Sequence, residues 1–376
     1  MGTLPKRCKK DTKHIATQGR KLMKRIGALA ISVMMVACLI SGCGAASGEA
    51  TVTSVSMGTA LPEVKEGNGP VIKFATGGQD TLPSYAAAID VVSDIEAQRD
   101  DLNIQYYGSR QLGDDEAILQ QVMTGTIQMG GTGASALAVY TNLMDAFTIP
   151  FLINNYDIER QAVKLPEAQA IFDKIEDELG IKILASYDSG MRYLANNTRP
   201  IESVQDMKGL KMRVVPTDCL INSFSALGAN PSTMNYGEIY TGLQNKVIDG
   251  EEINITSIYS EKHYEVLKYF TEIGLYPFET IIFCNAKWFN SLDPEVQEVL
   301  ENGFDKGYDY VFDKYIANAE ANGYQAMEDA GVQITEIEDT TPFEEAVAPV
   351  TEKYINADSL IKAFVDKVEI LKESGE

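Results

Sequence analysis

The stretch DPEVQEVLENGFDKGYDYVFDKYIANAEANGYQAMEDAG, residues 293–331, carries the clearest helical pattern of the chain. Asp293 is a good capping residue, Pro294 suits the first helical position, and Gly331 can supply a left-handed stop. The apolar residues between them recur at steps of three and four, which predicts one amphipathic helix: Val296, Val299, Leu300, Phe304, Tyr308, Phe312, Tyr315, Ile316 and Ala319. At 1.5 Å per residue this helix is about 55 Å long, more than the diameter of a small domain, so we expect it to lie along two domains. Three internal glycines cost about 1 kcal/mol each relative to alanine and predict a bend or a close contact: Gly303, Gly307 and Gly323.

The rest of the chain alternates short apolar runs with longer amphipathic segments. Strands are expected at 71–75, 103–107, 181–186 and 210–215, and helices at 85–98, 114–123, 158–179 and 238–245. This alternation predicts an α/β fold, and about 300 residues are enough for two cores of ordinary domain size.

The N-terminus has the order of an export signal. Lys24 and Arg25 precede an apolar run over residues 26–40, which is followed by Ser41, Gly42 and Cys43. A run of this length is short for a membrane span, which needs about 20 residues. Small residues directly before a cysteine resemble a bacterial lipobox, although a plain secretory signal is the alternative.

From these features we predict the processing and localisation of the protein. Residues 1–42 are a leader and lipoprotein signal peptide, with the translation start open between Met1 and Met23. Cys43 receives the lipid, and residues 43–69, rich in Gly, Ala, Ser, Thr and Glu, form a flexible tether. The protein is therefore expected outside the cell, anchored to the outer face of the cytoplasmic membrane.

Charge and composition disfavour several classes of function. The net charge is −22 although nine basic residues lie in the leader, which makes nucleic acid an unlikely partner. Beyond Cys43 the chain has two cysteines, Cys219 and Cys284, and one histidine, His263. We expect the cysteines to be core thiols, and we predict no metal, no cofactor and no histidine-based catalysis.

Three segments carry a resemblance to a known family. They are RQLGDDEAILQQVMTGTIQMG (residues 110–130) with FTIPFL (147–152), GMRYLANNTRPIESVQDMKGLKMRVVPT (190–217), and ALGANPSTMNYGEIYTGLQNKVIDGEE (226–252). Together they resemble the DctP-type substrate-binding subunits of TRAP transporters, the tripartite ATP-independent periplasmic carriers. The resemblance implies a two-domain periplasmic-binding-protein-like fold with a hinge and a ligand cleft between the domains. It places domain I at 70–190 plus 279–318 and domain II at 191–278 plus 319–370.

The resemblance also suggests how the ligand is bound. Arg213 matches the family arginine that binds the ligand carboxylate, and a guanidinium presents a planar donor fork to two carboxylate oxygens. Arg192 matches a second arginine that assists nearby, with an interdomain salt bridge as its alternative role. Tyr236 matches an aromatic residue that lies over the ligand.

The remaining candidates match less closely. The asparagine of the family's QEN segment is replaced by Ile253, and Asn254 follows one residue later, where a strand would turn it to the other face. Asp115 lies in the family's acidic turn, and Gln79 follows the first strand. Ser135, in a stretch poor in polar groups, and Thr217 complete the predicted substrate-binding set. That stretch favours a smaller or less hydroxylated ligand.

The resulting hypothesis is a solute-binding protein, not an enzyme. It would capture a small organic acid through an arginine clamp and deliver it to the small and large integral membrane subunits of a TRAP transporter. The alternatives are a binding lipoprotein of an ABC importer, a sensor module, and a lipid-anchored enzyme using acids such as Asp115 and Glu252.

Overall fold

The structure of the protein is a computed structural model that describes residues 68–374. The predicted leader, the predicted lipidation site at Cys43 and all but the end of the predicted tether lie outside these residues. Within residues 68–374 every helix is too short or too polar to span a bilayer.

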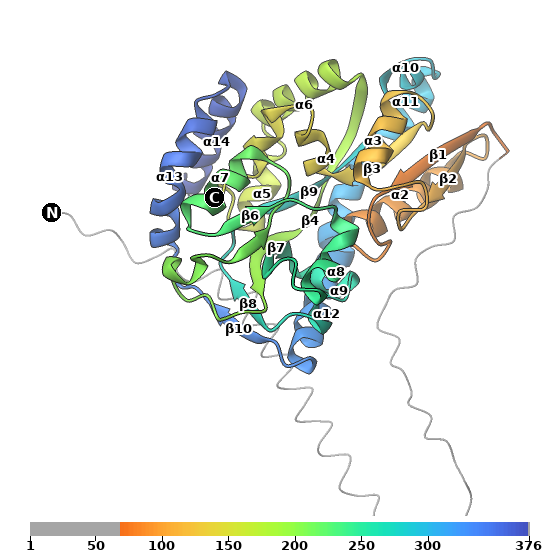
Figure 1. Cartoon of the computed structure of the whole chain (residues 1–376). Coiled ribbons are helices and arrows are strands. Elements are labelled where there is room, and N and C mark those ends of the chain that lie inside the picture. Colours follow the sequence, from red (N-terminus) through yellow and green to blue (C-terminus); the bar gives the residue numbers. More distant parts are fainter. Residues whose placement is uncertain (1–67, 375–376) are drawn as a thin grey trace, which may run out of the picture. The chain divides into compact units, whose positions relative to one another are not determined.

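The first part of the fold is built on a mixed sheet with the strand order β2-β1-β3-β9-β4 (Figure 1). Strand β1 pairs in parallel with β2 and β3, whereas β9 pairs antiparallel with both β3 and β4. Helices cover both faces of this sheet, so side chains on both faces of its strands are buried. We call this part the first lobe. Its strands are β1 (Val71–Thr76), β2 (Asn103–Tyr107), β3 (Met129–Gly133), β4 (Ile181–Asn196) and β9 (Pro277–Asn285).

The second lobe is built on β6, β5 and β7, which continue from the far end of β4, with β8 and β10 beside them. Strand β4 belongs to both sheets. Its residues 181–191 pair with β9 and its residues 192–196 with β7, and the pairing is irregular between Asp188 and Met191. The strands are β5 (Lys211–Arg213), β6 (Asn230–Ser232), β7 (Gly250–Asn254), β8 (Tyr269–Glu272) and β10 (Gln333–Glu336).

The helices before β4 cover the first lobe, those between β4 and β9 cover the second lobe, and α10, after β9, packs on the first lobe again. The segment predicted as one helix at 158–179 is two helices, because Pro166 begins a new one. These helices are α2 (Pro83–Gln98), α3 (Asp115–Met123), α4 (Ala134–Ala138), η1 (Asn142–Phe147), α5 (Tyr156–Ala162), α6 (Pro166–Leu179), η2 (Val204–Met207), α7 (Asp218–Ala226), η3 (Tyr236–Glu238), α8 (Ile239–Gln244), α9 (Ile255–Ser260), η4 (His263–Glu265) and α10 (Ala286–Phe289).

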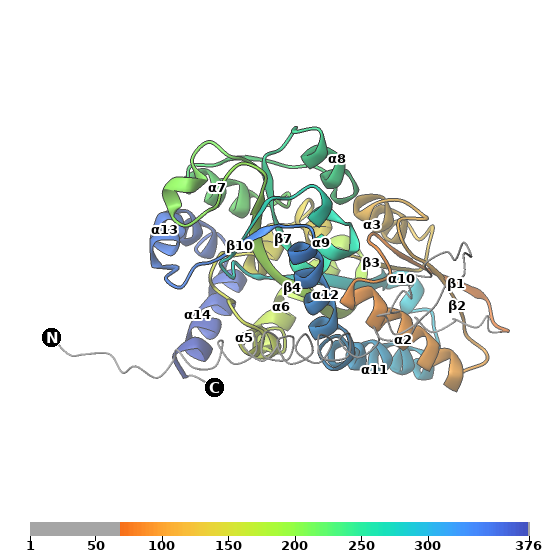
Figure 2. The same ribbon diagram turned by 90° about the horizontal axis from the view of Figure 1, so that it is seen from below.

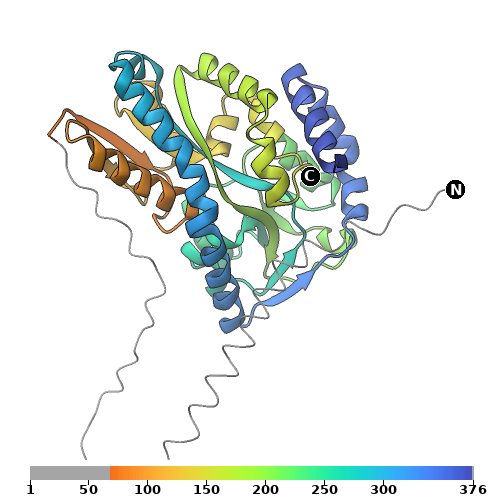
Figure 3. The ribbon, with the colours of Figure 1, turned by 180° about the vertical axis from the view of Figure 1, so that it is seen from behind.

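The predicted long helix is present, with one departure from regular geometry. It consists of α11 (Pro294–Tyr310), a π-helical turn η5 (Val311–Tyr315) and α12 (Ile316–Asp329). Figure 3 shows it as one continuous ribbon. The first half packs against α2 and β4, and the second half packs against α9 in the second lobe, so the helix spans both lobes as expected.

The internal glycines of this helix mark close contacts. A Cβ on Gly307 would lie 1.9 Å from the Tyr187 hydroxyl oxygen, and one on Gly323 would lie 2.3 Å from Ile255. The irregular turn falls between these glycines, at residues 311–315.

The chain ends with two helices that pack on different lobes. Helix α13 (Thr341–Ile355) packs on α7, whereas α14 (Ser359–Ser374) packs on α5 and α6 (Figure 2). Residues 359–374 therefore lie on the first lobe, although the predicted domain II extended to residue 370. The other domain boundaries stay a prediction. Cys219 and Cys284 are buried free thiols, as expected.

Candidate functional site

Arg213 is the last residue of β5, and its side chain is buried at the carboxyl end of that strand. Its Nε and Nη2 donate to the Met234 carbonyl oxygen at 3.3 and 3.2 Å, which fixes the plane of the guanidinium. Burial lowers the pKa of Arg213 from its ordinary value, but an arginine remains charged at any pH of interest.

Arg192 lies on β4 just beyond the irregular pairing, where the strand enters the second sheet. Only 2% of its surface is exposed. Its Nε donates to Glu252 Oε2 at 2.6 Å, its Nη2 to the Glu252 carbonyl at 2.6 Å, and its Nη1 to Asn254 Oδ1 at 3.3 Å. The Phe278 ring covers the guanidinium, with 4.6 Å between Cζ and the ring centroid. Burial alone would lower the pKa of Arg192, but the Glu252 carboxylate more than offsets this and raises it.

Glu252 connects the two arginines; the sequence suggested it only as an acid of the enzyme alternative, not as part of the substrate-binding set. Its Oε2 accepts from Arg192 and from the Tyr276 hydroxyl at 2.8 Å, and its Oε1 accepts from the Val215 amide at 2.8 Å. Arg213 Nη1 lies 3.9 Å from the same Oε1. Two buried guanidinium groups thus share one buried carboxylate, which leaves one positive charge uncompensated within this triad.

Asn254 faces the arginines because it shares one face of β7 with Glu252. Ile253 points the other way, into an apolar core of the second lobe. The Asn254 amide is already engaged, since Nδ2 donates to the Ser189 carbonyl and Oδ1 accepts from Arg192. Asn254 therefore holds the crossing strand and the arginine in place.

Asp115 approaches the arginines from the first lobe. Its Oδ2 accepts from the Gly133 amide at 3.2 Å, whereas no donor of the described residues reaches its buried Oδ1. Burial raises the pKa of Asp115 to about 6, and the charges of Arg110 and Arg213 act in the opposite direction. A buried acceptor without a donor, close to two guanidinium groups, is a position where a ligand donor is favourable.

Arg110 joins the two lobes and was also missed by sequence reasoning. It adopts a left-handed backbone conformation (φ 64°), and its Nη2 lies 2.6 Å from Glu261 Oε1 in the second lobe. Its Cζ lies 5.0 Å from the centroid of the Tyr236 ring. Asn235 Nδ2 makes a second contact of this kind, donating to Asp114 Oδ2 at 3.3 Å. We call Arg110, Glu261, Tyr236, Asp114 and Asn235 the interlobe contact.

The other predicted residues are more peripheral. Gln79 is half-buried and accepts from the Ser109 hydroxyl at 3.3 Å. Ser135 lies half-buried in the first turn of α4. Thr217 is buried, and its hydroxyl caps α7 at the Leu220 amide (3.2 Å) and hydrogen-bonds Asp145. Contact of any of the eight predicted residues with a ligand stays a prediction.

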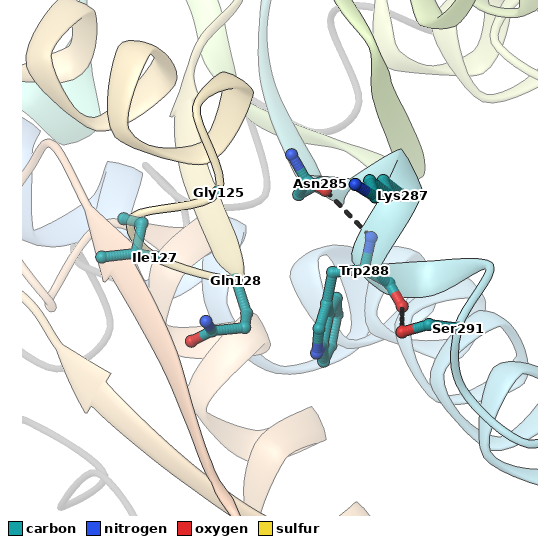
Figure 4. A pocket seen from close by; sticks show the side chains of 7 residues that line it. All are labelled: Gly125, Ile127, Gln128, Asn285, Lys287, Trp288 and Ser291. Carbon is teal, nitrogen blue, oxygen red and sulfur yellow. Dashed lines mark hydrogen bonds between the residues drawn. The ribbon is translucent and has the colours of Figure 1, made fainter.

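A separate depression of about 250 Å³ lies on the first lobe, between the end of α3 and the start of α10 (Figure 4). None of its lining residues belongs to the arginine site. They are Gly125, Ile127, Gln128, Asn285, Lys287, Trp288 and Ser291.

Comparisons with known proteins identify the family of the chain. The profile of the family described as "Bacterial extracellular solute-binding protein, family 7" (DctP) matches residues 79–358. The chain is 27% identical over 252 residues to the 2,3-diketo-L-gulonate-binding periplasmic protein YiaO of Escherichia coli, covering 67% of this chain and 76% of that protein. It is 31% identical over 198 residues to the C4-dicarboxylate-binding periplasmic protein DctP of Vibrio cholerae, covering 52% and 58%.

Solved structures confirm the predicted two-domain α/β fold. A TRAP periplasmic solute-binding protein from Anaerococcus prevotii with bound α/β-D-glucuronate matches with a TM-score of 0.76 and 25% identity, over 81% of this chain and 98% of that one. The corresponding protein from Roseobacter denitrificans with bound β-D-glucuronate gives 0.75 and 26%, over 80% and 99%. The fold and the profile match lead to one conclusion: this chain belongs to the DctP family of bacterial extracellular solute-binding proteins.

Proposed function

We propose that the protein captures a small organic acid by its carboxylate and delivers it to the membrane subunits of a TRAP transporter. The observation that carries this proposal is that two buried guanidinium groups, of Arg192 and Arg213, share the single paired carboxylate of Glu252. Burying a charge without a partner is costly, so a site of this kind favours an anion that restores neutrality. Arg213 is the clamp, because its Nη1 lies no closer than 3.9 Å to Glu252 and keeps donors for a ligand.

The opposite end of the site adds a constraint on the ligand. Asp115 Oδ1 has no donor from the described residues, so the ligand should carry a hydroxyl or another donor there. A second carboxylate at that position would repel Asp115 unless one of the two were protonated. We therefore propose a hydroxy acid in preference to an unsubstituted dicarboxylate. The relatives named as binding glucuronate or diketo-gulonate support this direction, whereas the relative named as C4-dicarboxylate-binding supports the other.

The test begins with the ligand. Native mass spectrometry of freshly purified protein identifies any retained acid, and a thermal-shift screen of organic acids identifies others, since binding raises Tm by mass action. Calorimetry then compares wild type with Arg213→Ala. Two lost hydrogen bonds to a charged group, at about 1.5–3 kcal/mol each, predict an affinity loss of roughly 10²- to 10⁴-fold.

A matched variant separates clamp from fold. Arg199 is also in the second lobe, but its guanidinium donates to the carbonyls of Asp206 and Lys208. Arg199→Ala should leave affinity unchanged. Unchanged affinity in a folded Arg213→Ala variant would refute the clamp.

We further propose that Cys43 is lipidated and anchors the exported protein. Cys43→Ser should abolish incorporation of a labelled fatty acid and release the protein from the membrane fraction. Equal labelling of wild type and Cys43→Ser would refute the anchor.

A further inference from the structure

Three buried carboxyl groups meet beside the point where β4 crosses between the sheets. Glu159 comes from α5, Asp188 from β4 and Glu279 from β9, and they are 0%, 0% and 2% exposed. Asp188 and Glu279 are direct partners in the β4–β9 pairing, at the edge of the irregularity. We call these three residues the hinge carboxyl cluster.

The hydrogen bonding of the cluster requires protons. Asp188 Oδ1 accepts from the Gly190 amide at 2.8 Å, and Glu279 Oε2 accepts from the Ser186 hydroxyl at 2.5 Å. Donors from other described residues reach neither oxygen of Glu159, nor Asp188 Oδ2, nor Glu279 Oε1. Side-chain contacts at hydrogen-bonding range join Glu159 to both other carboxyls. Two ionised carboxylates are both acceptors, so each such bond requires a proton on one partner.

Among the described residues, no cation forms an ion pair with the cluster. Arg160, the next residue of α5, points toward Asp309 at 3.9 Å, and both of these side chains are largely exposed. Lys164 Nζ lies 5.1 Å from the centroid of the Tyr308 ring. The other nearby titratable groups on the neighbouring elements are acidic or phenolic. They are Tyr156 on α5, Tyr308 on α11, Glu320 on α12, Tyr193 on β4 and Glu272 on β8.

The electrostatics of the cluster follow from this setting. Burial first, and the neighbouring carboxylates second, raise the pKa of Glu159 and of Asp188 well above their ordinary values, and burial also raises the pKa of Glu279. The folded state therefore binds more protons than the unfolded chain at neutral pH. Stability contributed by these protons is lost as the pH rises through the folded pKa values.

The cluster is connected to both lobes through the residues that follow Asp188. The Ser189 carbonyl accepts from Asn254 Nδ2 and the Thr256 hydroxyl of the second lobe. The Ser189 hydroxyl hydrogen-bonds those of Ser84 and Thr280 in the first lobe. Gly190 has a φ of 116°, which favours glycine, and Arg192 comes two residues later.

We propose that the hinge carboxyl cluster is a proton-loaded switch that sets the rigidity of residues 188–192. With its protons the cluster packs α5, β4 and β9 together. Without them the like charges repel, the segment loosens, and Arg192 loses its fixed position. The consequence for ligand capture rests on the proposed function, but the rigidity itself does not.

The test needs no ligand. Infrared spectra of the wild type at pH 7.5 should contain the band of protonated carboxyl groups, reduced in Glu159→Gln. The unfolding equilibrium constant of the wild type should rise between pH 7.5 and 9.5, by up to about tenfold per pH unit for each additional proton bound in the folded state. Hydrogen exchange of residues 188–192, corrected for the intrinsic rate, should increase over the same range. In Glu159→Gln both slopes should decrease.

The control is another buried carboxyl group, remote from the crossing strand. Asp145 lies in η1 beside Thr217 and Asp218, and burial raises its pKa to about 7. Asp145→Asn should retain the wild-type slopes above pH 7.5 at residues 188–192. If Glu159→Gln does not fold, Glu279→Gln can replace it in the comparison of pH slopes. The infrared measurement on the wild type can be made without any variant.

The absence of that band, or equal slopes in wild type and the glutamine variants, would overturn the proposal. A failure to find an acid ligand would instead count against the proposed function and leave these measurements valid. A ligand affinity that does not vary with pH while hinge exchange does would refute the link to capture.

Discussion

Removing the charge of Glu252 is the most informative perturbation of the arginine site. Glu252→Gln keeps the shape of the side chain but removes the carboxylate that Arg192 and Arg213 share, and Glu251, which forms no ion pair with either, remains as an acid that acts on both. All three residues are less than 5% exposed, so solvent can screen little of the repulsion between the two guanidinium groups. Removing one partner of a buried ion pair costs about 3–5 kcal/mol.

That cost is measurable as a thermal shift. At about 2–4 °C per kcal/mol for a protein of this size class, Glu252→Gln should lower Tm by roughly 6–20 °C. Because an anion can supply the missing charge, high concentrations of acetate should raise Tm more in Glu252→Gln than in the wild type. Differential scanning calorimetry with and without acetate, with sodium chloride at matched ionic strength, measures both effects.

Glu251 provides the control on the same strand. Its side chain lies on the opposite face of β7, and its Oε1 is 2.9 Å from His263 Nδ1. An imidazole, unlike a guanidinium, carries no permanent charge, so Glu251→Gln leaves no obligatory buried cation without its partner and should cost less than half as much. Equal losses in the two variants, or an equal acetate response, would refute the idea that Glu252 serves to balance the arginines.

Three further predictions concern other parts of the fold. Arg110→Ala removes the ion pair with Glu261 that joins the two lobes. The unliganded variant should therefore have a larger radius of gyration than the wild type by small-angle scattering. An unchanged radius in both Arg110→Ala and Glu261→Gln would contradict this prediction. Gly307→Ala places a Cβ 1.9 Å from the Tyr187 hydroxyl oxygen and should cost about 1–3 kcal/mol in urea unfolding, whereas the same change in a Tyr187→Phe background should cost less. The pKa of Asp145 in the folded protein is about 7, above its unfolded value near 3.9. The stability that this carboxyl contributes is therefore complete at low pH and is lost as the pH rises through roughly 4 to 7. Asp145→Asn should flatten the dependence of the unfolding free energy on pH in that window, and a wild-type slope in the variant would contradict this prediction.

Local patterns predicted the elements of the fold well. Apolar spacing identified the helix at 293–331, because both halves of it bury a stripe. The same spacing could not predict the π turn at 311–315, whose residues keep the apolar and polar alternation of a regular helix. Pro166 was a signal for a new helix, since proline favours the first turn. The segment was nevertheless predicted as one helix, because the residues on both sides of Pro166 follow a helical apolar pattern.

The site was predictable only where the family motif names its residues. Arg213 and Arg192 came from that motif, whereas Arg110 pairs with Glu261, 151 residues away, and no local pattern reveals such a partner. Glu159 was missed for a different reason. An acid on a short amphipathic helix is usually solvated, and its burial becomes evident only when the β4–β9 pairing brings Asp188 and Glu279 against it.

The π turn at Val311–Tyr315 determines where the second half of the spanning helix points. Each residue of a helix advances the side-chain direction by about 100°, so one extra residue in a turn reorients everything that follows. Deleting a residue there would regularise the backbone hydrogen bonds yet rotate α12 away from α9. The irregular turn thus allows one continuous helix to bury an apolar face against α2 and β4 in its first half and a differently oriented apolar face against α9 in its second half.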